Sequence, residues 1–178
     1  MDSNYLPGDF KKIIVSEEEI RGIISRIAKE ITRDYSGKKL IICGILRGCF
    51  IFMADLIRQI DLPVEVSFIK VSSYGSGKEP GNIEIIEFDG LDKYKEYDII
   101  VVDDILDTGN TFCRLEKYLK DKGFKSVNFC AFLDKPERRR SAVRVKYTGR
   151  QIENEFVVGY GLDLNEKYRN LPFVAAVK

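Results

Sequence analysis

The sequence contains no histidine and no tryptophan among its 178 residues. Without histidine, the protein cannot use the Ser-His or Cys-His arrangements of nucleophilic catalysis, and the commonest nitrogen ligand of zinc enzymes is missing. Acid–base chemistry must therefore come from Asp, Glu, Lys, Tyr or Cys side chains. A bound metal would be a hard cation held by oxygen ligands.

The chain also lacks an excess of charge and any long apolar run. Its 29 basic and 28 acidic residues give a net charge of +1, which is low for a protein built around a basic nucleic-acid face. The apolar runs span only a few residues, as at 99–102, whereas crossing a bilayer requires about 20. The four cysteines form no C-x-x-C pair, and the N-terminus does not resemble a signal peptide. We therefore expect reduced thiols, a cytoplasmic location and no membrane association.

The pattern of apolar residues predicts one α/β domain with a mostly parallel sheet flanked by helices. Ser16 and Glu19 form a capping box before a helical run that stops at Gly37. Further helices are predicted over 49–60, with Phe50 facing inward, and over 111–122. Residues 72–82 contain no aliphatic apolar side chain and are expected to form a long mobile loop. Strands are predicted over 40–45, 64–71, 83–88, 99–102, 127–133, 143–147, 156–160 and 173–177.

The segment 99–111 combines the features of a ligand site. Its apolar strand is followed by Asp103 and Asp104, then by a third acid in Asp107-Thr108-Gly109, and then by the start of a helix. Ligands of open α/β sheets bind beyond the carboxyl ends of the strands, and helix N-termini bind phosphate. The two adjacent acids suit sugar hydroxyls. The third is placed to exchange a proton with a group above the sugar.

This segment resembles the phosphoribosyl-diphosphate-binding motif of the type I phosphoribosyltransferases. Other motifs follow in the order found in the hypoxanthine-guanine phosphoribosyltransferases, and the resemblance spans roughly residues 10–178. These motifs are Leu46-Arg47-Gly48, Ser73-Tyr74, Asp134-Lys135-Pro136, Glu155 to Asp163, and Lys167-Tyr168-Arg169.

The resemblance implies the fold and the reaction. A 6-oxopurine and phosphoribosyl diphosphate would give IMP or GMP and pyrophosphate, with Mg²⁺ as the cofactor. The fold would be a single domain over 1–178, with a small hood formed by about 1–15 and 150–178 and a mobile active-site loop at about 72–82. Family members are commonly homodimers or homotetramers, and no nucleic-acid partner is expected.

The resemblance also implies roles for individual residues. Asp107 would be the general base and acid at the purine N7. The phosphoribosyl group would lie against Asp103, Asp104, Asp107, Thr108, Gly109, Asn110 and Thr111. Pyrophosphate would be bound by Arg47, Gly48 and Arg169, with the Leu46–Arg47 peptide often cis in the family. The purine would be bound by Lys135, Phe156, Val157 and Asp163. Ser73 and Tyr74 would belong to the mobile loop. Mg²⁺ would be held by Asp103, Asp104 and Asp163.

Three positions depart from the commonest family pattern. Arg47 stands where lysine is frequent, Arg150 where phenylalanine is common, and Leu164 where an aromatic residue is common. None is a catalytic carboxylate, so the departures bear on substrate tuning or local packing.

Two other functions fit parts of the sequence. An RNA-binding regulator with the same fold could use the basic residues of 135–150, although such a protein would not need Asp107, Lys135 and Phe156 together. A phosphate-receiving signalling domain also has an acidic pair at a strand end. It carries that pair near its N-terminus and lacks a loop such as 72–82.

Overall fold

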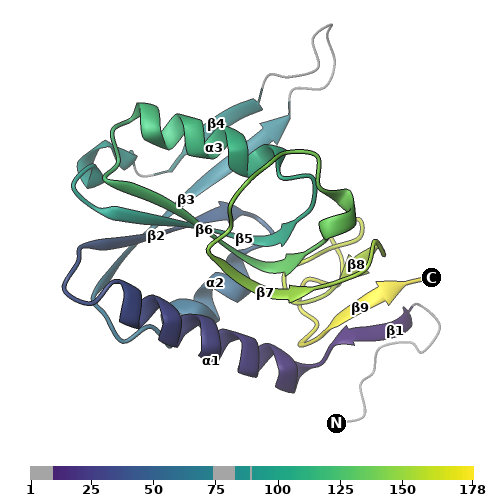
Figure 1. The fold of residues 1–178 in the computed structure, drawn as a ribbon. Coiled ribbons are helices and arrows are strands. Elements are labelled where there is room, and N and C mark those ends of the chain that lie inside the picture. The colour runs from purple at the N-terminus through teal and green to yellow at the C-terminus, as the bar shows by residue number, and fades with distance from the viewer. Residues whose placement is uncertain (1–9, 74–82, 89) are drawn as a thin grey trace, which may run out of the picture.

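A computed structural model of the chain describes residues 10–73, 83–88 and 90–178. The larger sheet has six strands in the order β4-β3-β2-β5-β6-β7, and the smaller has three in the order β1-β9-β8 (Figure 1). The helices are α1 (Glu17–Asp34), α2 (Phe50–Ile57) and α3 (Asn110–Asp121), with 3-10 turns at Leu91–Tyr94 and Pro136–Arg138. The strands are β1 (Phe10–Val15), β2 (Leu40–Leu46), β3 (Val64–Ser73), β4 (Ile83–Glu87), β5 (Asp98–Leu106), β6 (Ser126–Asp134), β7 (Tyr147–Gln151), β8 (Val157–Val158) and β9 (Val174–Val177).

The larger sheet confirms the expected α/β architecture. Its strands pair in parallel from β3 to β7, and only β4 runs antiparallel to its neighbour. Helices α1 and α2 cover one face and α3 covers the other (Figure 1). The parallel strands therefore end together at one edge, which faces the smaller sheet (Figure 1). No helix in the described part of the chain is long and apolar enough to span a membrane.

The central strands β2 and β5 are buried on both faces, as their continuous apolar sequence predicts. Ile42 and Ile100 belong to the cluster under α1 and α2. Their neighbours Ile41 and Ile99 belong to the cluster under α3. Because successive side chains of a strand point to opposite faces, one apolar run fills both layers of the core.

Helix α1 begins at the predicted capping box. The Ser16 N–H donates to the Glu19 carboxylate at 2.8 Å, and the Glu19 N–H donates to Ser16 Oγ at 3.3 Å. The helix ends at Asp34, before Gly37. Its buried face consists of Ile20, Ile24, Ile27, Ala28 and Ile31.

Several predicted boundaries differ from the structure. Helix α2 ends at Ile57 rather than at residue 60, and Phe50 is exposed because Phe52 takes the inward position. Residues 143–146 form no strand, and β7 starts at Tyr147. Strand β3 continues through Ser73, so residues 72 and 73 belong to a strand rather than to the predicted loop. The rest of that loop, residues 74–82 including Tyr74, lies outside the described residues.

The smaller sheet joins the two ends of the described chain. Strand β1 pairs antiparallel with β9, with Phe10 opposite Val177 and Val15 opposite Val174. Strand β9 also pairs antiparallel with β8. This three-stranded sheet lies beyond the carboxyl edge of β5 and β6 (Figure 1), and residues 159–173 connect β8 to β9.

Candidate active site

The acidic pair lies inside strand β5, which continues to Leu106 rather than ending at residue 102. The Asp104 N–H donates to Asp103 Oδ1 at 3.0 Å. Burial raises the pKa of both side chains, and the neighbouring charge of Asp104 raises the pKa of Asp103 further. Two carboxylates that are disfavoured as anions are well suited to cations or hydroxyl donors, because either would stabilise the ionised form.

A glycine brings the Arg47 loop directly against this pair. Strand β2 ends at Leu46, and the Leu46–Arg47 peptide is cis. A Cβ atom at Gly48 would lie 1.6 Å from Asp104 Oδ2, so a larger residue at this position would displace the Asp104 carboxylate. The loop and the acidic pair, which are far apart in the sequence, therefore form one continuous surface.

Cys49 follows Gly48 and directly precedes α2, and its side chain is fully buried. Burial and the charges of Asp103 and Asp104 raise its pKa. Of the other cysteines, Cys43 and Cys130 are also buried, and all four are free thiols, as the sequence predicts. The Cys49 thiol therefore stays protonated and serves as packing beneath the site.

Helix α3 starts from a loop that suits an anion. Gly109 has φ +84°, a left-handed conformation, and precedes the first helical residue, Asn110. The Thr108 carbonyl accepts hydrogen bonds from the N–H groups of Arg140 and Ser141, at 2.9 and 3.1 Å. These bonds fix the loop, and the Asn110 N–H donates to Thr108 Oγ1 at 3.4 Å. Backbone N–H groups at the start of a helix are suitable donors for a phosphate. The loop residues predicted from the sequence, 107–111, are thus contiguous with the acidic strand.

Asp107 pairs with an arginine that the sequence analysis did not identify. Arg138 Nε lies 2.9 Å from Asp107 Oδ1, and its Nη2 lies 3.4 Å from Oδ2. The Asp107 side chain is 40% exposed, so a ligand can still reach it. Arg138 follows the predicted Lys135-Pro136 motif in a basic run, which was the only signal in the sequence that could have pointed to it.

Lys135 is attached to the same edge of the sheet. Its N–H donates to the Leu106 carbonyl at 2.9 Å, which ties the end of β6 to the end of β5. Burial lowers the pKa of the Lys135 ammonium, and the Arg138 charge lowers it further, whereas Asp107 opposes the shift. The structure therefore brings Lys135, Asp107 and Arg138 into one electrostatic group.

Two further residues predicted to bind the purine, Phe156 and Val157, lie at the start of β8 in the smaller sheet. Val157 is buried in β8, whereas the Phe156 side chain just before it is 58% exposed. The Phe156 carbonyl accepts a hydrogen bond from the Val177 N–H at 3.0 Å. The backbone is thus fixed while the aromatic ring remains free to stack on a ligand.

The turn after β8 is packed against the Arg47 loop. A Cβ at Gly161 would lie 2.1 Å from the Gly48 carbonyl oxygen. The Arg169 guanidinium donates to the Gly161 carbonyl at 2.7 Å and also bonds Asp163 at 2.7 Å. Arg169 also lowers the pKa of Asp104, against the larger effect of burial. Arg47, Gly48 and Arg169, predicted to bind one ligand group, therefore lie in contiguous segments.

Glu166 is a second residue that the sequence analysis missed. Its carboxylate bonds both Arg47 and Arg169. The two acids and two bases within residues 163–169 were the only local sign of such a network. Of the loop pair, Ser73 ends β3, and Tyr74 is not among the described residues.

The predicted metal ligands do not form a complete protein site. Within residues 10–73, 83–88 and 90–178, no group of three or more acids or cysteines is placed to hold a metal ion. Asp163 uses one oxygen for Arg169 and the other, Oδ2, for the Glu166 N–H at 2.9 Å. A hard cation at Asp103 and Asp104 would therefore share its coordination sphere with oxygens of a ligand, a common arrangement for Mg²⁺.

Comparisons with known proteins agree with this site. Residues 12–165 match the phosphoribosyl transferase domain family. The chain is 40% identical over 171 residues to the hypoxanthine-guanine phosphoribosyltransferase of Staphylococcus aureus strain Mu50, and the alignment covers 96% of this chain and 95% of the relative.

Solved structures give the same result. A crystal structure of a hypoxanthine phosphoribosyltransferase from Staphylococcus aureus superimposes with a TM-score of 0.88 at 39% identity, covering 96% of this chain and 92% of that one. A hypoxanthine-guanine phosphoribosyltransferase from Bacillus anthracis gives a TM-score of 0.86 at 38% identity, covering 95% and 98%. The fold, the acidic pair that is contiguous with the start of α3, and the matches to these relatives over at least 95% of this chain together place this chain in the phosphoribosyltransferase family.

Proposed function

We propose that this protein is a purine-salvage phosphoribosyltransferase that converts hypoxanthine, guanine or both, with phosphoribosyl diphosphate, to IMP or GMP and pyrophosphate. One observation carries the proposal: Asp104 packs against the Gly48 loop, and the strand that holds Asp103 and Asp104 leads directly to the start of α3. A ribose over the two acids would have its 5′-phosphate at residues 108–111. Its pyrophosphate would lie at Arg47 and Arg169.

The charges of the site suit the bond changes of this reaction. The purine N9 forms a bond to the anomeric carbon, and the bond from that carbon to pyrophosphate breaks, with its electron pair leaving on the pyrophosphate oxygen. Positive charge that develops on the ribose is stabilised by the Asp103 and Asp104 carboxylates. Negative charge on the leaving pyrophosphate is stabilised by Arg47 and Arg169. The proton at the purine N7 passes to Asp107.

The choice of base follows from donors and acceptors. The Lys135 ammonium donates to the 6-oxo oxygen of hypoxanthine or guanine. Adenine carries an amino donor at this position, so it would leave the ammonium without an acceptor. The exposed ring of Phe156 stacks on the purine, and the backbone of Val157 faces its edge.

The donor set fits Mg²⁺, since it consists of carboxylate oxygens, and burial disfavours the ionised form of two of these carboxylates, Asp103 and Asp104, unless a cation is present. Asp103, Asp104 and Asp163 are the residues we assign to it, with the remaining ligands supplied by the substrate. When bound, Mg²⁺ would neutralise charge on the pyrophosphate and orient it.

A steady-state comparison of hypoxanthine, guanine, xanthine and adenine, each with phosphoribosyl diphosphate and Mg²⁺, tests the proposal. We expect nucleotide and pyrophosphate from at least one of hypoxanthine and guanine, and no measurable use of adenine. A preference for adenine, or no nucleotide from any base, would contradict it.

The RNA-binding alternative is not favoured by the structure. Four of the seven basic side chains in 135–150 pair with acids of the same chain: Arg138 with Asp107, Arg139 with Asp134, Lys146 with Asp34 and Arg150 with Glu19. An electrostatic RNA-binding surface needs cations that are free to neutralise phosphates. We therefore propose small molecules, and not nucleic acid, as the ligands.

The proposal extends to domain organisation, assembly and location. Residues 1–178 would form one catalytic domain with a hood at about 1–15 and 150–178, acting in the cytoplasm as a homodimer or homotetramer. Large apolar side chains exposed at Phe50, Ile86 and Phe88 support self-association. Size-exclusion chromatography with light scattering would measure the number of subunits. A monomer at micromolar concentration would contradict the proposed homodimer or homotetramer.

A further inference from the structure

One carboxylate links the two arginines that the proposed reaction needs for pyrophosphate. Glu166 Oε1 lies 2.5 Å from Arg47 Nη2, and its Oε2 lies 3.3 Å from Arg169 Nη2. Each carboxylate oxygen of Glu166 therefore pairs with the guanidinium of a different arginine. The carboxylate occupies the position of an anion that bridges the two arginines.

The backbone holds Glu166 in this position. Asn165 and Glu166 have φ values of +52° and +65°, which residues other than glycine rarely adopt. The Glu166 N–H donates to Asp163 Oδ2 at 2.9 Å. Leu164 and Lys167 close the turn with two backbone hydrogen bonds of 3.2 and 3.1 Å. The turn therefore presents the Glu166 side chain to the arginines by its own geometry.

The turn is continuous with the acidic pair. Arg169 is fixed to Gly161 by a 2.7 Å bond from its guanidinium to the Gly161 carbonyl and by a 2.9 Å bond from the Gly161 N–H to the Arg169 carbonyl. Gly161 packs on the Gly48 carbonyl, and Gly48 packs on Asp104. An anion bound beside Asp104 at Arg47 and Arg169 would thus compete with Glu166 for both of them.

The pairs are also exposed enough to be broken. The side chains of Arg47 and Glu166 are 66% and 61% exposed, so water stabilises each of them when they separate. By contrast, Arg169 is largely buried, and its Asp163 bond would hold it in place when Glu166 leaves. Glu166 can therefore move away while Asp163 keeps Arg169 in position.

We propose that Glu166 is an internal competitor of pyrophosphate, a carboxylate that pairs with Arg47 and Arg169 in the unliganded protein and is displaced when pyrophosphate or its phosphoribosyl ester binds. This inference rests on the proposed function, because that function assigns pyrophosphate to the two arginines. Pyrophosphate has to break both pairs to bind, and Glu166 re-forms them as it leaves. Glu166 thereby weakens the binding of this product and speeds its release.

The test is calorimetric binding of inorganic pyrophosphate, with Mg²⁺ present, to the wild-type protein and to Glu166→Gln. Glutamine keeps the size of the side chain and removes its charge. Because exposed ion pairs are weak, we expect pyrophosphate to bind about three- to tenfold more tightly to Glu166→Gln, with the gain shrinking at high salt. We also expect a lower KM for phosphoribosyl diphosphate and a lower kcat.

Glu17→Gln is the matched control. Glu17 is an exposed acid bonded to an arginine, Arg21, at 2.8 Å, and it lies on α1 outside the proposed site. This variant should bind pyrophosphate as the wild type does. Thermal unfolding of both variants checks that each is folded.

Equal or weaker pyrophosphate binding by Glu166→Gln, or no pyrophosphate binding by either protein, would overturn the inference. Because calorimetry needs no turnover, its result is separate from that of the proposed function. A wild-type protein that forms no nucleotide from any base would contradict the function, whatever pyrophosphate does.

Discussion

The guanidinium of Arg138 faces both carboxylate oxygens of Asp107, with Nε 2.9 Å from Oδ1 and Nη2 3.4 Å from Oδ2. A forked contact of this kind fixes the plane of a carboxylate as well as its position. Asp107 also interacts with Lys135, whose ammonium it helps to keep charged. The residue assigned to proton transfer is thus held by the element that carries the assigned purine-binding cation.

Replacing Asp107 by asparagine should remove the proton acceptor while keeping the shape of the side chain. We expect kcat to fall by about 10²- to 10⁴-fold, the usual contribution of general acid–base catalysis. IMP should still bind, because the other residues proposed to contact the phosphoribosyl group are unchanged. Steady-state kinetics and IMP calorimetry measure the two effects. Glu137→Gln, a change at a neighbouring exposed acid, should leave both unchanged. Wild-type turnover in Asp107→Asn would remove its assigned role.

Lys135→Gln should weaken discrimination against adenine. Glutamine can donate to an oxo group or accept from an amino group, so the ratio of kcat/KM for hypoxanthine over adenine should fall by about tenfold or more. The four-base comparison measures this ratio. An unchanged ratio would count against Lys135 as the selectivity residue.

The same lysine predicts a pH dependence. Burial lowers the Lys135 pKa below its ordinary value of 10.5, so its ammonium is present at neutral pH and is lost earlier than usual as the pH rises. The KM for hypoxanthine should therefore rise above that lowered pKa. The Lys135→Arg protein stays charged throughout this pH range, so its KM–pH profile reports only the titration of hypoxanthine itself. Subtracting that profile from the wild-type profile isolates the effect of Lys135. Identical profiles for the two proteins would contradict the assignment.

The acidic pair, Asp103 and Asp104, should lower the free energy of unfolding. Burial raises the pKa of Asp103 above its ordinary value of 3.8, so its ionisation destabilises the fold at pH 7, and this cost shrinks as the pH falls below the raised pKa and is gone only below the ordinary value. Asp103→Asn keeps the oxygen that accepts from the Asp104 N–H. We expect this variant to be more stable by about 1–2 kcal/mol at pH 7, with much lower activity. Urea unfolding at pH 7 and pH 5 tests this: the gain should be smaller at pH 5, and a loss of stability at pH 7 would contradict the argument.

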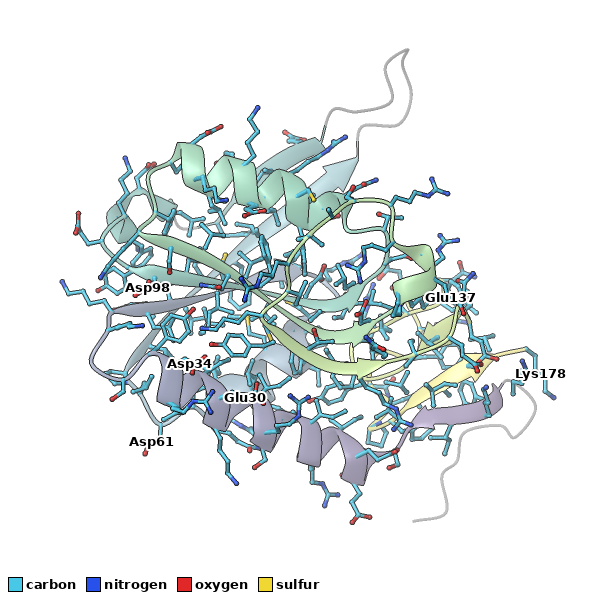
Figure 2. The ribbon with its side chains drawn as sticks, in the orientation of Figure 1. Glu30, Asp34, Asp61, Asp98, Glu137 and Lys178 are labelled. Carbon is cyan, nitrogen blue, oxygen red and sulfur yellow. The ribbon has the colours of Figure 1, made fainter. Side chains whose placement is uncertain are left out.

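Asp34 predicts the opposite dependence at the far end of the sheet. Figure 2 shows Asp34 and Asp98 at the end remote from Glu137. Lys146 at 3.0 Å and the Tyr147 hydroxyl at 2.9 Å contribute to lowering the pKa of Asp34 to about 2. This stabilisation is present above about pH 4 and is lost as the pH falls towards 2.

Asp34→Asn should therefore lower the free energy of unfolding at pH 7 by only about 1 kcal/mol, since solvent screens a partly exposed pair. The difference from wild type should vanish near pH 2, and the kinetic constants at pH 7 should not change. A pH-independent difference would show that the ion pair is not its cause.

Local sequence patterns predicted the parts of the site that lie close together in the chain. The acids, the loop glycine and the start of α3 fall within thirteen residues, and the structure keeps them contiguous. The expected end of β5 was wrong because a charged residue was taken to end the strand. In the structure, Asp103 still pairs with Ala131 and Ile105 with Leu133, so the ladder continues through half-buried acids.

The strand predicted over 143–147 was wrong for a different reason. Its alternation is real, because Val143 and Val145 pack against the cluster under α3. Burial of alternate side chains does not require ladder hydrogen bonds, and regular pairing with β6 begins only at Tyr147.

Arg138 and Glu166 could not be found from local patterns. Arg138 contacts an acid 31 residues away, and Glu166 contacts an arginine 119 residues away. Only the fold brings these partners together, through the junction of β5 with β6 and the packing of Gly161 on Gly48. A single sequence does not record such pairs.

The most direct measurement is a crystal structure of the protein with Mg²⁺ and IMP. We expect the ribose hydroxyls at Asp103 and Asp104, the 5′-phosphate at residues 108–111 and the 6-oxo oxygen at Lys135. A nucleotide bound elsewhere, with the surface between Gly48 and the start of α3 left to solvent, would contradict it.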